Sequence, residues 1–274
     1  HITYFDENQR EFTKQIDSIF YLINKSLSTY IPTSDISKIN KGDTTVVVDV
    51  FSQEVFQKSK NLYEETGGVF DPTVELLVNA WGFGPQKSFD KLDTIKIKEL
   101  LNLVGFDKVI MENGKLIKAN NNIYIGFNAI AKGFAVDVAG RFLESKNVKN
   151  YLVEIGGEIR ARGNNKKRNA PWKMGIEDPN FYGTRSLKKI IELNDESIAT
   201  SGNYRKFKFD SISGKKYAHI INTETGYPAQ NNLLSVSVIA KLDCADVDAY
   251  ATALMAMTLN AAMEFLEKHP ELKG

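Results

Sequence analysis

Two oxygen-bearing side chains, Asp248 and Thr252, stand one helical turn apart in an almost wholly apolar stretch, CADVDAYATALMAM at residues 244–257. Asp248 and Thr252 have the i to i+4 spacing that places side chains on one face of a helix. A helix this apolar belongs in a core, where an ionised carboxylate needs a counter-charge, hydrogen bonds or a metal ion. Carboxylate and hydroxyl oxygens suit magnesium or calcium better than zinc, so the pair is a candidate hard-cation site. The structural alternative is that Asp248 caps a loop and Thr252 bonds back to a helical carbonyl.

Among the three histidines, His219 is the candidate general base. His1 is terminal and His269 lies in a charged tail, whereas His219 falls in an expected strand at 217–221, followed by a polar turn. A histidine titrates near neutral pH and can take a proton from a hydroxyl, which contributes roughly 10²- to 10⁴-fold to a rate. The alternative is a strand histidine that bonds to a cross-strand partner.

Glycines and one lysine indicate a place for phosphate. Gly156-Gly157, Gly202 and Gly226 interrupt strands or their ends, where a chain without Cβ atoms can approach a ligand closely. Lys132 adds positive charge to the first turn of a helix expected at 131–144. The chain has no GxxxxGK[ST] loop and no GxGxxG after a strand. A phosphate-bearing ligand would therefore not be held in the Walker or Rossmann manner.

Aromatic residues near the expected loops could stack on a planar ring, although packing in the core is the commoner role of such residues. They are Tyr30, Trp81, Phe83, Tyr204 and Tyr227.

The elements that must position these side chains come in blocks of helices and of strands. Periodicity, turn residues and capping residues predict helices at 12–27, 52–65, 71–81, 94–104, 131–144, 244–257 and 261–268. They predict strands at 44–50, 108–111, 115–118, 123–125, 151–155, 158–162, 172–176, 187–193, 205–209, 217–221 and 233–240. Blocks rather than strict alternation favour an α+β fold with mixed or antiparallel sheets and flanking helices. We expect a single domain over residues 1–274, with two closely packed lobes as the alternative arrangement.

Composition excludes several classes of function. Lys+Arg 35 against Asp+Glu 34 gives a net charge of +1, so no overall field attracts nucleic acid. The single cysteine, Cys244, rules out an internal disulfide and a cysteine-based zinc cluster. The chain opens on His1 rather than on a methionine, as a trimmed or processed chain does, and a signal peptide or lipid anchor could have been removed from it.

Seven blocks of sequence, in order along nearly the whole chain, resemble the ApbE-type FAD:protein FMN transferases. They are SDISKIN (34–40), FDPTVELLVNAWGFGP (70–85), NAIAKGFAVD (128–137), YLVEIGGEIRARG (151–163), IATSGNYRKF (198–207), HIINTETGYP (219–228) and DCADVDAYATAL (243–254). One departure is Asn222-Thr223, where relatives often have Asp-Pro. The resemblance implies an ApbE-like, T-fold-related architecture.

The resemblance also implies an activity and a set of residues. The implied enzyme requires Mg²⁺, binds FAD as its substrate, transfers FMN to a threonine hydroxyl of an acceptor protein and releases AMP. The implied metal ligands are Asp248, Thr252 and the backbone carbonyl of Ala129, and the implied base is His219. Lys132 would lie near the flavin nucleotide. The resemblance further implies an FAD pocket lined by Tyr30, Asn40, Asp71 and Ile220.

Two rival functions remain open from the sequence. A magnesium-dependent FAD pyrophosphatase would use the same site with water in place of threonine and would release free FMN and AMP. A flavin-binding protein without turnover needs no base, and His219 beside the Asp248/Thr252 pair argues against that reading. Relatives work outside the cytoplasm, often as lipid-anchored proteins, so we expect an extracytoplasmic place on the outer face of the cell membrane.

Overall fold

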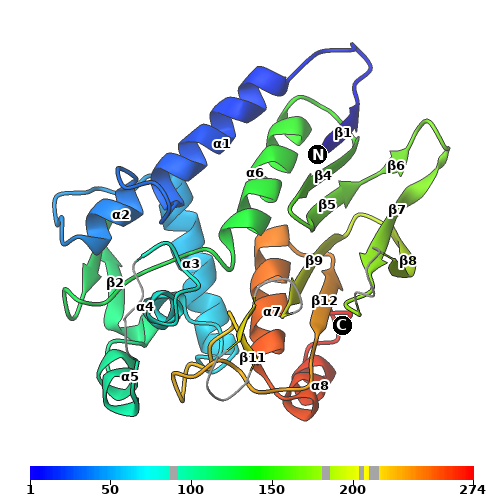
Figure 1. The fold of residues 1–274 in the computed structure, drawn as a ribbon. Helices are drawn as coiled ribbons and strands as arrows, with labels where there is room; N and C mark the ends of the chain where they lie inside the picture. Colours follow the sequence, from blue (N-terminus) through cyan, green and yellow to red (C-terminus); the bar gives the residue numbers. More distant parts are fainter. Residues whose placement is uncertain (87–91, 181–185, 204–206, 210–215) are drawn as a thin grey trace.

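A five-stranded antiparallel sheet forms the centre of the protein (Figure 1). The computed structural model describes residues 1–86, 92–180, 186–203, 207–209 and 216–274. The strand order is β1-β4-β5-β9-β12, so the first strand of the chain lies at one edge and the last at the other. The strands are β1 (Ile2–Phe5), β4 (Asn150–Ile155), β5 (Glu158–Arg162), β9 (Ser197–Gly202) and β12 (Ser235–Ala240). The α+β class with antiparallel sheets is thus confirmed.

Two helices cover one face of this sheet. The helix α6 (Ala131–Ser145) packs on β4 and β5, and α7 (Cys244–Ala256) packs on β9 and β12. The two helices touch at Gly133, where an added Cβ would lie 2.3 Å from the carbonyl oxygen of Cys244. Only a glycine fits there, and it brings the start of α6 against the start of α7.

A smaller sheet covers the opposite face. It has the order β6-β7-β8, with β6 (Asn164–Asn165), β7 (Ala170–Glu177) and β8 (Leu187–Leu193). Its apolar residues pack in one cluster with side chains of β4, β5 and β9, and the buried members are Leu152, Ile159, Ala161, Trp172, Leu193 and Ile198. The large sheet is therefore buried on both faces.

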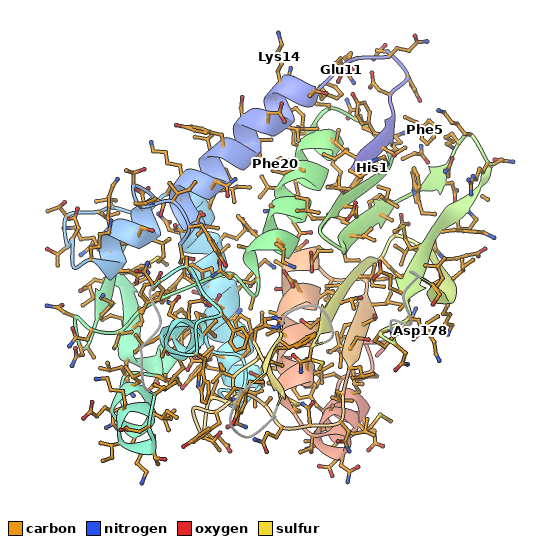
Figure 2. The ribbon with its side chains drawn as sticks, viewed as in Figure 1. His1, Phe5, Glu11, Lys14, Phe20 and Asp178 are labelled. Carbon is orange, nitrogen blue, oxygen red and sulfur yellow. The ribbon has the colours of Figure 1, made fainter. Side chains whose placement is uncertain are left out.

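The remaining elements extend the helical side of the molecule. The long α1 (Thr13–Leu27) lies along α6, and Phe20 packs against the cluster that contains Val136 and Leu143 of α6 (Figure 2). The others are α2 (Asp35–Asn40), α3 (Val50–Glu65), a 3-10 turn (Pro72–Val74), α4 (Glu75–Ala80), α5 (Thr94–Leu101), a second 3-10 turn (Phe106–Lys108), β2 (Val109–Glu112), β3 (Lys115–Lys118), β10 (Phe207–Phe209), β11 (Lys216–Ala218) and α8 (Leu259–Lys268). Within the described residues, no helix has the length and apolar character needed to span a membrane.

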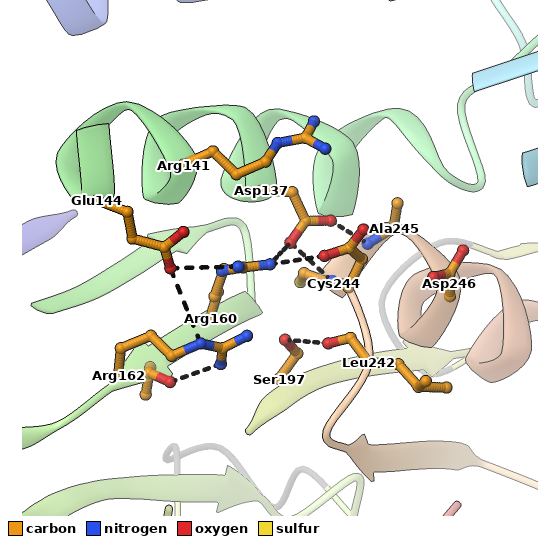
Figure 3. A network of polar contacts seen from close by, with 12 residues as sticks. Asp137, Arg141, Glu144, Arg160, Arg162, Ser197, Leu242, Cys244, Ala245 and Asp246 are labelled. Carbon is orange, nitrogen blue, oxygen red and sulfur yellow. Dashed lines mark hydrogen bonds and ion pairs between the residues drawn. The ribbon is translucent and has the colours of Figure 1, made fainter. Parts of the chain in front are cut away.

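A buried charge network fixes the start of α7 (Figure 3). Asp137 of α6 accepts hydrogen bonds from the backbone N–H groups of Cys244 (2.9 Å) and Ala245 (2.8 Å). Arg160 of β5 donates to Asp137 (2.8 Å) and to Asp243 (2.7 Å). Figure 3 shows α6, β5 and the first turn of α7 converging on the Arg160 guanidinium. We call Asp137, Arg160 and Asp243 the α7 anchor.

The predicted helices and most predicted strands are present, but the strands β1, β6 and β9 were not predicted, and several predicted strands differ from the structure. In β9, Ser-Ile-Ala-Thr-Ser-Gly, small residues outnumber the β-branched residues Ile198 and Thr200, so the strand signal is weak. The predicted strands 44–50 and 123–125 are irregular, and the side-chain amide of Asn40 bonds both backbone groups of Ile125 in place of a sheet neighbour (2.8 Å each). The strand predicted at 217–221 ends at Ala218, and residues 205 and 206 of the predicted strand 205–209 lie outside the described residues.

Candidate active site

The predicted site residues converge on one cavity of about 190 Å³ beside α7. Its walls come from the middle of α7, the loop before α6, the 3-10 turn with α4, and the segment after β11. Of the nine residues expected as metal ligands, as the base or on the FAD side, eight line it: Tyr30, Asp71, Ala129, Lys132, His219, Ile220, Asp248 and Thr252. These residues come from segments that lie far apart in the chain, so the cavity exists only in the folded protein.

Asp248 is a buried acid of the cavity with few hydrogen-bond partners. Its side chain is buried, with 3 % of its surface exposed, and it accepts one hydrogen bond among the described residues, from the backbone N–H of Gly133 (3.1 Å). Burial raises the pKa of Asp248 to about 7, and repulsion from Glu158 adds to the shift while Lys132 opposes it. Most of the carboxylate's capacity to accept bonds is therefore left for a ligand.

Thr252 lies one turn further along α7, and its hydroxyl is 3.1 Å from the hydroxyl of Ser201 on β9. Ala129 lines the cavity from the loop before α6. A carboxylate, a hydroxyl and a carbonyl make an all-oxygen set of donors, which fits magnesium or calcium. An underbonded, buried Asp248 is what such a set requires, since a cation would supply the missing partner. The residues present thus fit the Mg²⁺ site that the sequence predicted.

Lys132 enters the cavity from the first turn of α6 and forms an ion pair with Glu158 of β5. Burial opposes the charge on Lys132, but the carboxylates of Asp248 and Glu158 outweigh it and raise the lysine's pKa. Burial raises the pKa of Glu158, and the lysine opposes that shift. Lys132 is therefore held as a cation between two acids at the edge of the cavity.

His219 follows the last residue of β11 in a bend, not within a strand as the sequence predicted. Its ring lies edge-on to Phe83, with centroids 6.4 Å apart. The polar turn behind it is organised by Asn222, whose side-chain oxygen accepts the N–H groups of Glu224 (3.0 Å) and Thr225 (2.8 Å). Asn222 thus caps the turn with its own side chain.

The expected FAD-pocket residues separate into those that reach the cavity and one that does not. Tyr30 is 59 % exposed at the rim, and Ile220 is buried in the wall. Asp71 lines the wall but already accepts the N–H of Thr73 (2.7 Å) and its hydroxyl (2.6 Å). Burial raises the pKa of Asp71. Asn40 does not line this cavity, and its amide is bonded to the backbone of Ile125.

Three polar residues of the cavity were not singled out in the sequence. Asn128 donates to Glu75 (2.8 Å) and to Thr29 (3.1 Å), and Asn128, Glu75 and Ser201 all line the cavity. Asn128, Glu75 and Ser201 lie within the motif blocks already noted, so the blocks were the signal.

Of the aromatic residues considered for stacking, Trp81 and Tyr227 pack on each other, with ring centroids 5.8 Å apart, and Tyr204 lies outside the described residues.

Two further cavities adjoin the first one. One of about 560 Å³ lies toward α1 and is lined by Leu27, Tyr30 and Asn128 among others. The other, of about 440 Å³, lies toward β5, β7 and β9. Both include Lys132 and His219, so these two side chains stand where the three spaces meet.

Several known proteins resemble this chain in both sequence and fold. A FAD:protein FMN transferase from Haemophilus influenzae is 36% identical over 98% of this chain and 80% of its own length. A relative of the same name from Vibrio cholerae is 38% identical over 92% of this chain and 75% of its own length. The solved structure of the flavin transferase ApbE from Vibrio cholerae superposes with a TM-score of 0.85 at 33% identity, covering 98% of this chain and 86% of that chain.

A second solved structure, the apo form of the Pseudomonas stutzeri flavinyl transferase ApbE, also gives a TM-score of 0.85, at 28% identity, over 98% of this chain and 84% of that chain. The protein is accordingly an enzyme of the transferase class built on an α+β fold. The sequence profile of the ApbE family matches residues 1–274, and the chain belongs to that family.

Proposed function

We propose that the protein transfers the FMN unit of FAD to a threonine hydroxyl of an acceptor protein, in a Mg²⁺-dependent reaction that releases AMP. The names of the relatives support the flavin transfer itself. The observation that carries the finer proposal is the convergence of Asp248, Thr252, Lys132 and His219 on one cavity.

The reaction is a substitution at phosphorus. The threonine oxygen forms a bond to the FMN phosphorus of FAD, and the bond from that phosphorus to the bridging pyrophosphate oxygen breaks. The bridging oxygen leaves with AMP, and His219 takes the hydroxyl proton. In phosphoryl transfer, the protein contributes mainly by positioning and by electrostatic stabilisation.

Asp248, Thr252 and the carbonyl of Ala129 would hold the magnesium ion. The bound ion supplies positive charge that offsets the charge developing on the pyrophosphate. Lys132, kept cationic beside Asp248 and Glu158, would add a second positive group on the phosphate side. Tyr30, Asp71 and Ile220, which line the same cavity, would contact the FAD.

The direct test incubates the protein with FAD, Mg²⁺ and a co-expressed candidate acceptor, followed by intact-mass spectrometry. Transfer adds the mass of FMN less one water to the acceptor, and peptide mapping should place it on a threonine. Free FMN with an unmodified acceptor would instead support the FAD pyrophosphatase, and unchanged FAD would support a binding protein.

The role of His219 is tested by His219→Ala. We expect FAD affinity to stay within about twofold and transfer to fall roughly 10²- to 10⁴-fold, because a base acts mainly in the transition state. Wild-type transfer rates in this variant would exclude His219 as the base.

The metal site is tested by Asp248→Ala together with EDTA. Both should abolish transfer, and added Mg²⁺ should restore the EDTA-treated wild type but not the variant. Normal transfer in saturating EDTA would refute the metal requirement.

The proposal extends to location. We expect the protein to act outside the cytoplasm, on the outer face of the cell membrane and held there by a lipid anchor, as the family resemblance implies. Protease accessibility in intact cells tests this expectation, and complete protection of the protein until the cells are lysed would contradict it.

A further inference from the structure

The strand β9 runs past the end of its neighbour β5. The two strands pair through Ile159 with Ile198 and Arg160 with Ser197. The chain then reverses through the two-residue turn Gly156-Gly157, so β5 has no residue opposite Thr200 to Gly202. On its other side β9 remains paired with β12 as far as Gly202. Among the described residues, the last three positions of β9 thus form an open sheet edge.

Alternation along the strand shows which backbone groups face this open side. The N–H of Ala161 in β5 donates to the carbonyl of Glu196 (3.0 Å), and the N–H of Asn203 donates to the carbonyl of Leu234, which precedes β12 (2.9 Å). In an antiparallel sheet, successive residues direct their backbone groups to opposite neighbours. Even-numbered residues therefore point toward β5, and Thr200 and Gly202 present their N–H and C=O groups beyond its end.

These groups face the cavity of about 440 Å³, which Thr200, Ser201 and Gly202 all line. The same cavity reaches Lys132 and His219, the two side chains where it meets the FAD-side spaces. A segment lying along β9 would therefore pass directly beside the proposed base.

Side-chain alternation leaves this space open. Ser201 points toward Thr252 and the helical layer, so Thr200 and position 202 face the other side of the sheet, toward the cavity. Gly202 has no side chain to fill it, and its backbone does not have a positive φ. A glycine that the backbone conformation does not require, at a cavity wall, keeps room for a ligand.

The cavity offers little that would attract a nucleotide. Among the described residues that line it, Lys132 is the only lysine or arginine, and it is already paired with Glu158. A peptide backbone is neutral and offers the N–H and C=O groups that an open edge binds.

From this geometry we infer that the acceptor protein binds as a short added strand along Thr200–Gly202, with its threonine side chain directed at His219. This inference rests on the proposed function, because it assigns the place of that reaction's second substrate. Three residues of edge give few backbone bonds, which suits a substrate that must leave after modification.

The first experiment measures amide hydrogen exchange by NMR, with and without the co-expressed acceptor protein. In the free enzyme the amides of Thr200 and Gly202 should exchange faster than that of Ser201, which points to β12. The acceptor should slow amide exchange at Thr200 and Gly202 and leave the exchange rate of Ser201 unchanged. Equal protection of all three in the free enzyme, or no response to the acceptor, overturns the inference.

The second experiment compares Gly202→Trp with Gly202→Ala. The tryptophan should fill the cavity and raise the KM for the acceptor by about tenfold or more, while the Kd for FAD changes by less than about twofold. The alanine should change both by less than about threefold. An unchanged acceptor KM in Gly202→Trp, or a parallel loss of FAD affinity, rejects the inference.

The two experiments separate this inference from the proposed function. If the wild type transfers no FMN although the candidate protein still slows exchange at Thr200 and Gly202, the proposed function fails while the binding edge stands. If FMN is transferred by the wild type and by Gly202→Trp alike, the function stands and the binding edge is wrong.

Discussion

Two buried aspartates, Asp137 of α6 beside the start of α7 and Asp248 within α7, differ in how many hydrogen bonds they accept. Asp137, with 0 % of its surface exposed, accepts two backbone N–H groups and pairs with Arg160. Asp248, with 3 % exposed, accepts one N–H and lies near Lys132, which bonds to Glu158 instead. Burial is the first cause of a raised pKa in both, to about 6 for Asp137 and about 7 for Asp248.

The difference separates a fully bonded carboxylate from one that keeps free acceptor capacity. The α7 anchor meets its bonding requirements inside the protein and holds α6, β5 and α7 together. Asp248 is held in place by that packing but keeps free acceptor capacity, so its charge is costly until a cation arrives. Burial and a raised pKa alone would not have told the two apart, whereas the bonding partners do.

The largest effect on stability should come from breaking the α7 anchor. Asp137→Ala leaves Arg160 short of a partner and two backbone N–H groups without an acceptor, so the free energy of unfolding should fall by about 3–5 kcal/mol. Urea denaturation measures it. A loss below about 1 kcal/mol would show that the anchor is not a stabilising unit, and the comparison would break.

Asp248→Asn should act in the opposite direction in EDTA. The folded pKa of about 7 lies above the reference value of 3.8, so the stability linked to this proton is complete below pH 3.8 and is lost as the pH rises through 7. The variant should therefore match the wild type near pH 4 and exceed it by about 1 kcal/mol or more at pH 8. Urea titrations at both pH values measure the gap.

Saturating Mg²⁺ supplies the control for that variant. The ion should stabilise the wild type at pH 8 and leave Asp248→Asn nearly unchanged. If the asparagine variant were less stable than the wild type in EDTA at pH 8, Asp248 would be a structural group like Asp137.

Thr252→Val should change stability by no more than about 1 kcal/mol, because it removes only the hydrogen bond with Ser201. Transfer should fall about tenfold at limiting Mg²⁺ and recover partly when Mg²⁺ is raised, since one of the three proposed ligands would be lost. Ser26→Ala, which removes a hydroxyl bonded to Asp49 (2.8 Å), is the matched control and should leave the Mg²⁺ dependence unchanged. An equal change in both variants would remove Thr252 from the metal site.

The smallest effect is expected at the rim of the anchor. Glu144 contacts Arg160 (3.3 Å), but its side chain is 40% exposed. Solvent screens such pairs, so Glu144→Gln should lower the free energy of unfolding by less than about 1 kcal/mol. Denaturation at low and high salt would check this, and a loss comparable to that of Asp137→Ala would extend the anchor to its exposed rim.

Much of the site could be predicted because local sequence sets its parts. The i to i+4 spacing of Asp248 and Thr252 on an apolar helix was enough to place both on one face. The family blocks then named most of the cavity's lining. Asn40 was expected in the FAD pocket from its block, and the structure adds that its amide bonds the backbone of Ile125, a contact across 85 positions of the chain that the sequence did not predict.

The sequence by itself determined the helices, most strands, the oxygen-bearing pair on α7 and the single candidate base, since periodicity, capping and residue chemistry act over a few neighbours. Only the tertiary structure decided that Asp137 is fully bonded and Asp248 is not. It also decided that His219 lies past the end of its strand and that β9 extends beyond the end of β5. Those facts depend on which distant segments supply hydrogen-bond partners, and a buried group's partners are fixed by packing rather than by its neighbours in sequence.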